Sequence, residues 1–206
     1  DYCEIVRRYN PNSCMKLMVE RPTLDVLPRF LRMYVRLGAQ KDGFLVRCRP
    51  IVGLDGCHLK GFFTGQILAA VGRDGNNNMF PIAFAVVEVE TKDSWIWFPN
   101  ELMNDIGSVE EHGWTFISDR QKGLVEAFDE VLPNVDNRFC VRHMYENFKK
   151  KFKGLELKDA MWKATLSTTV REFKGHMKRI QLMDPENEAA YKWLTAIDPA
   201  LWSRSH

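Results

Sequence analysis

The sequence predicts an α/β fold built on a mixed sheet, in which three antiparallel strands are followed by alternating helices and strands. Short runs rich in Val, Ile and Phe lie at 49–55, 66–74 and 79–90, and each is bounded by Gly, Asn or Asp, as strands are. The connections between these runs are short, which favours antiparallel pairing. Helical and strand patterns then alternate as far as residue 143, and strand signals stop beyond it.

The first part of the chain is predicted to be helical. Apolar residues recur at steps of three and four between Leu27 and Leu37, as on the buried side of an amphipathic helix. Pro28 suits a first helical turn, and Gly38 suits a C-terminal stop. We therefore expect a helical leader over residues 1–45.

The three strands open a central domain that we place at 46–153. The stretch "GRDGNNN" is typical of a tight turn between the second and third strands. A helix is expected at 93–107, where Asp93 or Ser94 can cap the start and Gly107 can end it. Its apolar residues fall on one face: Trp95, Phe98, Leu102 and Ile106.

The later elements complete the predicted order. A fourth strand is expected at 114–119, a helix at 122–133 and a fifth strand at 138–143. Residues 154–206 are expected to form an all-α insertion, whose last long helix is capped by Asp184 and has Pro185 in its first position. Three tryptophans of the helical part are expected in its core rather than on a surface that stacks bases: Trp162, Trp193 and Trp202.

Composition limits the class of protein. The 206 residues are 45% hydrophobic, enough for a buried core, and 29 basic against 27 acidic residues give a net charge of +2, which does not by itself indicate a nucleic-acid partner. Five cysteines without a CxxC pair favour a reducing, intracellular compartment. No apolar run reaches the roughly 20 residues that a membrane helix needs. Because the chain does not begin with Met, we expect it to be a piece of a longer protein.

Two aspartates occupy equivalent positions. Asp55 closes the first strand and Asp119 closes the fourth, and a polar turn containing glycine follows each. An aspartate at a strand end is most often a turn residue. If the two strands are neighbours, however, the carboxylates converge and suit Mg²⁺ or Mn²⁺. Two such ions about 4 Å apart would support phosphodiester chemistry.

Cys140 and His143 form a C-x-x-H pair at the end of the fifth strand. A zinc site would require two further ligands, and the remaining histidines do not have the spacing to supply them. We favour a buried cysteine with a hydrogen-bonded histidine near the active face. Glu146 lies three residues further on and is either a third metal carboxylate or, as is commoner, a solvated residue.

Basic residues are candidate phosphate contacts. Lys60, Arg120 and Lys122 flank the two aspartates, and a lysine cluster at 148–154 is joined by Arg142. Such side chains contact phosphates in nucleic-acid complexes. A charged run is more often an ordinary solvated helix face.

Several motifs together resemble the MULE transposase domain of plant Mutator-like elements. They are the stretch from "CRPIVGLDGCHLKG" to "KDSWIWF", then "FISDRQKGL", "RFCVRHMYENF" and "WLTAIDPALWSRSH", in that order. The resemblance implies a ribonuclease-H-like fold, a DDE metal site with two Mg²⁺ or Mn²⁺ ions, and cut-and-paste DNA transposition in the nucleus by a homo-oligomer. It assigns Asp55 and Asp119 as the first two acids and Cys140 and His143 to the family's C-x-x-H signature.

The third acid is where this chain departs from the family. The resemblance implies a glutamate in an asparagine-rich helix downstream of "WSR", and the sequence ends before that motif, which leaves Glu146 as the substitute within the chain. The chain is therefore expected to be an incomplete transposase core. The alternatives are a domesticated transposase relative that binds DNA and regulates transcription without cleavage, and an inactive fragment.

Overall fold

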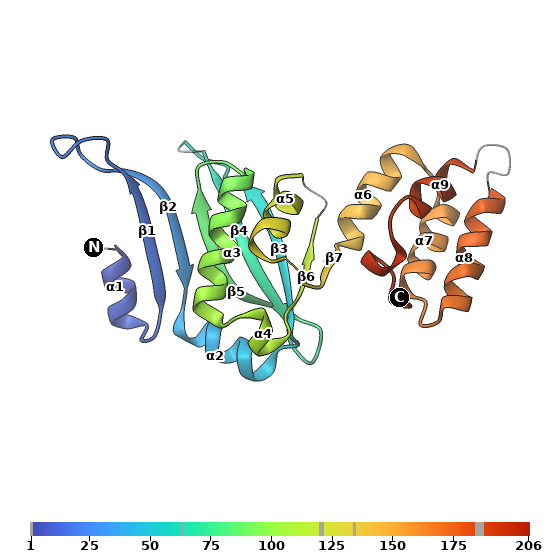
Figure 1. The fold of residues 1–206 in the computed structure, drawn as a ribbon, viewed down its shortest axis with the longest axis horizontal. Coiled ribbons are helices and arrows are strands. Elements are labelled where there is room, and N and C mark those ends of the chain that lie inside the picture. Colours follow the sequence, from blue (N-terminus) through green and yellow to red (C-terminus); the bar gives the residue numbers. More distant parts are fainter. Residues whose placement is uncertain (1, 63, 120–121, 134, 184–187) are drawn as a thin grey trace. The chain divides into compact units, whose positions relative to one another are not determined.

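The computed structural model describes residues 2–62, 64–119, 122–133, 135–183 and 188–206. The chain forms two compact units (Figure 1), which are residues 1–136 (the sheet unit) and residues 137–206 (the helical unit). In the described part of the chain, no helix is long and apolar enough to cross a membrane.

The sheet unit alternates strands with helices. Its strands are β1 (Cys14–Glu20), β2 (Arg29–Arg36), β3 (Ile51–His58), β4 (Gln66–Arg73), β5 (Met79–Val87) and β6 (Thr115–Ser118). Its helices are α1 (Tyr2–Tyr9), α2 (Gly38–Arg47), α3 (Lys92–Ile106), α4 (Val109–His112) and α5 (Lys122–Val131). The mixed α/β class predicted from the sequence is confirmed.

The strands of this unit lie in the order β1-β2-β5-β4-β3-β6. The three strands predicted first, β3, β4 and β5, pair antiparallel with one another in sequence order, and β6 pairs parallel with β3. The turn between β4 and β5 forms as expected. In it Asp74 and Asn78 close a loop by a backbone hydrogen bond of 3.1 Å, and Asn77 adopts a positive φ of 65°.

The helical leader is wrong between Leu27 and Leu37. That segment contains β2, which pairs with β1 on one side and with β5 on the other. The spacing of these apolar residues is compatible with a helix or with a strand. Here the backbone N–H and C=O groups form their hydrogen bonds with two neighbouring strands instead of within a helix. Helices are found only near the ends of the leader, in α1 and α2.

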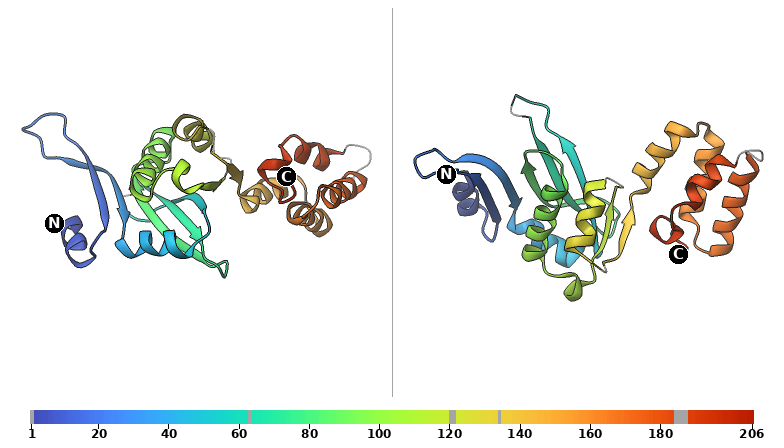
Figure 2. Two further views of the ribbon diagram at one scale, coloured as in Figure 1. Left: turned by 60° about the horizontal axis from the view of Figure 1, so that its bottom comes forward. Right: turned by 45° about the horizontal axis from the view of Figure 1, so that its top comes forward.

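Helices α3 and α5 pack side by side on one face of the sheet, as the views in Figure 1 and Figure 2 show. The predicted apolar face of α3 is confirmed, because Trp95, Phe98, Leu102 and Ile106 are each at most 1% exposed. Gly107 ends the helix at a φ of 101°.

The predicted cap of α3 is wrong by two or three positions. Thr91 is the N-cap, and its side chain accepts a hydrogen bond from the Ser94 backbone N–H at 3.3 Å. The Ser94 hydroxyl in turn accepts one from the Thr91 N–H at 2.9 Å. This reciprocal pair satisfies two backbone donors that no helical carbonyl reaches.

A buried polar cluster joins β2 to α3. The Arg36 guanidinium pairs with the Asp105 carboxylate, and the Tyr34 hydroxyl donates to the same carboxylate at 2.9 Å. Burial alone would raise the pKa of Asp105, but the hydrogen bonds from Arg36 and Tyr34 outweigh it and lower that pKa below its usual range. Nearby, Arg32 pairs with both Glu88 and Asp93. Removing one partner from such a pair is costly because the other charge stays buried.

The helical unit begins with one short strand. Its elements are β7 (Asn137–Phe139), α6 (Val141–Lys151), α7 (Leu155–Leu166), α8 (Val170–Met183), α9 (Ala189–Thr195) and the 3-10 helix η1 (Pro199–Leu201). The fifth strand is therefore much shorter than the predicted 138–143, because Cys140 is already the N-cap of α6. Asp184 and Pro185 lie outside the described residues, and Glu188 is the N-cap of α9.

The helical unit has a separate core of methionines and aromatic residues. Met144, Phe148, Met161 and Trp202 are each at most 3% exposed within it. Trp162 and Trp193 are partly buried, and Trp193 packs against the Phe148 ring. The expectation that Trp202 belongs to the core is confirmed, and Trp193 packs against that core.

Candidate functional site

The register between β3 and β6 brings the two predicted acids to equivalent positions. Gly53 is the partner of Ile117 in this parallel pair, and Asp55 and Asp119 each follow two residues further on. Neighbouring strands lie about 4.8 Å apart. The sequence-based condition for a shared carboxylate site, that the first and fourth predicted strands are neighbours, is therefore met.

Asp55 falls on the face of the sheet that α3 and α5 do not cover. Asp55 pairs with Ala69 of β4, and that row of the sheet is at least partly exposed, whereas Leu54 and Ala70 in the next row are buried. Side chains alternate between the faces of a strand, so Ile117 shares the face of Asp55, and Asp119 follows Ile117 by two residues, directly after the end of β6. Asp55 is exposed, and one carboxylate oxygen accepts a hydrogen bond from the Gly56 N–H at 2.9 Å.

A third carboxylate, which the sequence reasoning did not single out, lies at the same end of β3. The Glu90 side chain covers Gly56, so that a Cβ built on this glycine would lie 2.9 Å from Glu90 Oε1. The indole N–H of Trp95 donates to the same oxygen at 3.1 Å. Trp95 is only 1% exposed, so the Glu90 carboxylate is held by a rigid donor, in a space that only a glycine leaves open.

The electrostatics of Glu90 connect it with the two aspartates. Burial raises the pKa of Glu90, and the negative charges of Asp119 and Asp55 raise it further, while the Trp95 hydrogen bond and His58 act in the opposite direction. Glu90 is thus within electrostatic reach of both aspartates. Glu90 reaches this point from the helix-covered side, because Gly56 is on the opposite face of β3 from Asp55.

The strand meander explains why Glu90 arrives there. His58 at the end of β3 pairs with Gln66 at the start of β4, and Gln66 pairs with Val87 at the end of β5. The end of β5 therefore lies at the same edge of the sheet as the end of β3. The signal in the sequence is the acidic "EVE" that directly follows the third predicted strand, and two short connections suffice to bring it beside "LDG".

The donor set suits a hard divalent cation. Carboxylate oxygens are what Mg²⁺ and Mn²⁺ prefer, and Mg²⁺ is commonly held by one or two carboxylates together with waters and substrate phosphates. Within the described residues no three His, Cys, Asp or Glu side chains are close enough together to form a metal cluster. The fit therefore rests on Asp55 and Asp119 as a pair, with Glu90 at their side.

The predicted C-x-x-H pair is in the helical unit, on a helix rather than on a strand. Cys140 is partly buried at the N-cap of α6 and makes no side-chain capping bond, and His143 lies in the first turn. The His143 Nδ1 atom is buried, and no described residue bonds to it, so the expected hydrogen-bonded histidine is not found at that atom. Glu146 pairs instead with Lys149 at 2.5 Å.

The predicted phosphate contacts are spread over both units. Lys60 is exposed in the loop after β3, two residues beyond His58, and Arg142 is exposed in the first turn of α6. Lys122 begins α5, but its side chain lies outside the described part of the structure, as does all of Arg120. Of the predicted phosphate contacts, only Lys60 has a described side chain and lies close in sequence to a candidate acid, Asp55.

Comparison with known proteins identifies one segment of the chain. Residues 51–147 match the family model of the MULE transposase domain, and this segment contains Asp55, Glu90 and Asp119. No curated protein matches the chain in a sequence search. The match supports a transposase-related function, which implies interaction with DNA.

Proposed function

Because residues 51–147 form a MULE transposase domain, we propose that the chain is the metal-dependent catalytic core of a DNA transposase that cuts DNA strands and transfers them to a new site. The observation that carries the proposal is the parallel register of β3 and β6. That register brings Asp55, within β3, and Asp119, the residue after β6, to equivalent positions beside each other. An open face is needed if an extended DNA backbone is to reach both carboxylates.

Asp55 and Asp119 would hold the cation. When bound, Mg²⁺ or Mn²⁺ supplies a water of lowered pKa and stabilises the charge on the leaving oxygen, and two ions about 4 Å apart can act on both sides of the phosphate. The protein itself fixes the two carboxylates on adjacent strands of a hydrogen-bonded sheet, so they need little reorganisation. The ribonuclease-H-like character of the fold is part of this proposal.

Glu90 adds a third negative charge near the proposed site, from the helix-covered face of β3, without completing a three-ligand cluster within the described residues. The Trp95 hydrogen bond and the Gly56 backbone hold it at the residue that follows Asp55 in β3. A carboxylate this close to two others is repelled by them, and a cation relieves the repulsion. Glu90 is therefore a stronger candidate than Glu146, which is already paired with Lys149.

The partner in this proposal is DNA, comprising the transposon ends and the target. A nuclear site of action and a homo-oligomer of the whole protein belong to the same proposal. Lys60 is the described basic residue that is nearest along β3 to Asp55 and suits a backbone phosphate.

Metal binding tests the proposal directly. The free Mn²⁺ signal in electron paramagnetic resonance should fall when this chain is added, and the fall should be lost in Asp55→Asn and in Asp119→Asn. The same two substitutions should be made in a longer form of the protein that contains the third family acid. There, each should reduce Mg²⁺-dependent nicking of transposon-end DNA by more than about 100-fold relative to the wild type, which exceeds the usual cost of losing an outer-shell partner.

Matched variants sharpen the metal experiment. Asp42→Asn removes an exposed carboxylate of α2 and should leave both Mn²⁺ binding and nicking unchanged. Glu90→Gln keeps an acceptor for Trp95 while it removes the charge, so it should weaken Mn²⁺ binding without unfolding the protein. Wild-type Mn²⁺ affinity and nicking in Asp55→Asn would refute the proposal.

A second candidate function is DNA binding without cleavage, as in a domesticated regulator. The observation in its favour is that the described residues form no three-ligand metal cluster. In that case the longer protein would bind DNA equally well with Mg²⁺ or with a chelator, and Asp55→Asn would alter neither binding nor any product. Mg²⁺-dependent strand cleavage would decide for the transposase.

A further inference from the structure

The positive charge of the chain is concentrated in the helical unit. Residues 137–206 carry 14 Lys and Arg against 8 Asp and Glu, a net charge of +6, whereas residues 1–136 carry 15 against 19, a net charge of −4. Within the helical unit, residues 141–166 alone carry 7 basic and 3 acidic residues. The overall charge of +2 does not reveal this division between the units. A basic surface on α6 and α7 favours binding to a negatively charged partner.

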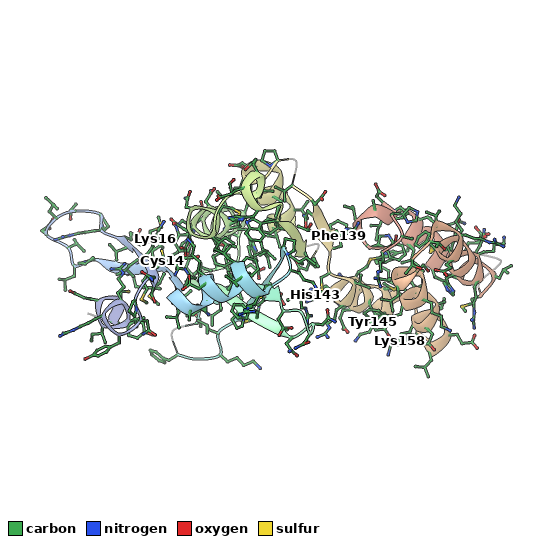
Figure 3. All side chains as sticks on the ribbon, turned by 90° about the horizontal axis from the view of Figure 1, so that it is seen from below. Cys14, Lys16, Phe139, His143, Tyr145 and Lys158 are labelled. Carbon is green, nitrogen blue, oxygen red and sulfur yellow. The ribbon has the colours of Figure 1, made fainter. Side chains whose placement is uncertain are left out.

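The centre of this surface is an aromatic ring between two lysines. The ammonium groups of Lys149, on α6, and Lys158, on α7, each lie 5.8 Å from the centre of the Tyr145 ring. Tyr145 and Lys158 are seen from below in Figure 3. Cation–π attraction of this kind holds the flexible lysine side chains in place. We call the surface of Arg142, Tyr145, Lys149 and Lys158 the lysine–tyrosine face.

Helical spacing brings these residues to one side. Arg142, Tyr145 and Lys149 are separated by three and four positions on α6 and therefore share a face. Trp162 of α7 packs against the Tyr145 ring, and the two ring centres are 6.3 Å apart. The face is thus built from two helices that are fixed by a common core.

The charges of the face are incompletely neutralised. The carboxylates of residues 141–166 are Glu146, Glu156 and Asp159. Glu146 pairs with Lys149 at 2.5 Å, but no described carboxylate is within ion-pair distance of Lys158. Arg142 is exposed in the same stripe. Arg142 and Lys158 thus have no carboxylate partner among the described residues, and both are available to a negatively charged partner.

We propose that the lysine–tyrosine face is a docking surface for the backbone of duplex DNA. The inference rests on the proposed function, since it says which surface of the helical unit would hold the DNA of a transposase core. Lys149 and Lys158 already occupy the Tyr145 ring, so the ring serves to position the ammonium groups and is not free to stack on a base. Phosphates rather than bases are therefore the natural contacts, and they are accessible in a duplex.

Binding to a mixed-sequence 30-base-pair duplex, measured by fluorescence anisotropy between 50 and 200 mM salt in EDTA, tests the inference. The double variant Lys149→Gln with Lys158→Gln should bind more weakly at each salt concentration, and its slope of log affinity against log salt should be about 2 units shallower, since each lost phosphate contact removes about 0.9. Tyr145→Phe keeps the ring and should bind like the wild type.

The control pair has the same loss of charge elsewhere in the helical unit. Lys174→Gln with Lys178→Gln changes two exposed lysines of α8 and should leave the slope within about 0.5 of the wild type. An equal change in both double variants would overturn the inference, because it would mean that overall charge alone attracts DNA. Tighter binding to a single strand than to the duplex, lost in Tyr145→Leu, would also overturn it, because the ring would then stack on a base.

The same assay separates this inference from the proposed catalytic function. Asp55→Asn and Asp119→Asn should bind the duplex as well as the wild type in EDTA, because the experiment requires no cation. Duplex binding that depends on Lys149 and Lys158 in a protein that never cleaves DNA would leave the docking surface standing and refute the catalytic proposal. Strand cleavage by a protein whose duplex binding is unchanged in the lysine double variant would leave the catalytic proposal standing and refute the docking surface.

Discussion

The sheet unit and the helical unit carry charge in opposite ways. The sheet unit has a net charge of −4 and buries two of its cations, Arg32 and Arg36, each 5% exposed, against carboxylates of or near α3. The helical unit has a net charge of +6, builds its core from methionines and aromatic rings, and keeps its lysines at the surface. Charge therefore holds together the framework of the first unit, whereas in the second it is available to a partner.

The contrast has a physical cause. In the sheet unit, β2 lies between β1 and β5, and buried polar side chains fix it to α3. Short antiparallel helices can bury their apolar faces against one another without such pairs. Mutations of the buried charged residues should therefore destabilise the first unit and spare the second.

The largest expected effect comes from breaking the buried pair in the sheet unit. Arg36→Met leaves Asp105 buried without its cation, which should cost about 3–5 kcal/mol in free energy of unfolding. Peptide-resolved hydrogen exchange should show lost protection in β2 and α3 and unchanged protection in α7 and α8.

The double change tests the same comparison from the other side. Arg36→Met together with Asp105→Leu removes both charges and should recover much of the stability, since an apolar replacement of a buried pair is often tolerated. If protection in α7 and α8 fell as far as in α3 in the single variant, the two units would not be independent in stability.

Acidification should produce a smaller effect with the same asymmetry. The folded pKa of Asp105 lies below its unfolded value, so its stabilising contribution is present above the unfolded value of about 3.9 and is lost as the pH falls through the folded pKa. Glu88 behaves alike, because the Arg32 hydrogen bond lowers its pKa. Urea unfolding followed by hydrogen exchange should show the sheet unit weakening first below about pH 4.

The Asp105→Asn variant is the control for this pH dependence. It cannot be protonated, so it should be less stable at pH 7 but change less than the wild type between pH 5 and pH 3. A wild-type sheet unit that keeps its stability throughout this range would contradict the assignment of the Arg36–Asp105 pair as the acid-sensitive element.

The smallest expected effect concerns helix caps. Thr91→Ala removes the side-chain cap of α3 and should cost about 1 kcal/mol in free energy of unfolding, measured by thermal denaturation. Cys140 occupies the equivalent position on α6 but makes no side-chain capping bond, so Cys140→Ala should cost less than half as much. Equal losses would mean that packing around Cys140, rather than capping, dominates there.

Much of the fold was predictable because the sheet unit is largely patterned by short, bounded apolar runs. The order of β3, β4, β5, α3, β6 and α5 follows the predicted order, and the antiparallel pairing of the first three is confirmed. The segment around β2 could not be assigned in this way, because residues spaced from Leu27 to Leu37 fit either regular structure. The C-x-x-H pair was misplaced for a related reason, since "RFCV" is apolar enough to extend a strand that in fact ends at Phe139.

The candidate site divides along the same line. By itself, the sequence determined that Asp55 and Asp119 each follow an apolar run, because hydrophobic period and turn residues are local properties of the chain. The predicted strand end at Asp55 is wrong, since β3 continues to His58. Only the tertiary structure decided that the two strands are parallel neighbours in register, that β2 is a strand between β1 and β5, and that Glu90 lies over Gly56 under a Trp95 hydrogen bond. Those outcomes depend on pairing between segments far apart in the chain, and no local pattern encodes the partner.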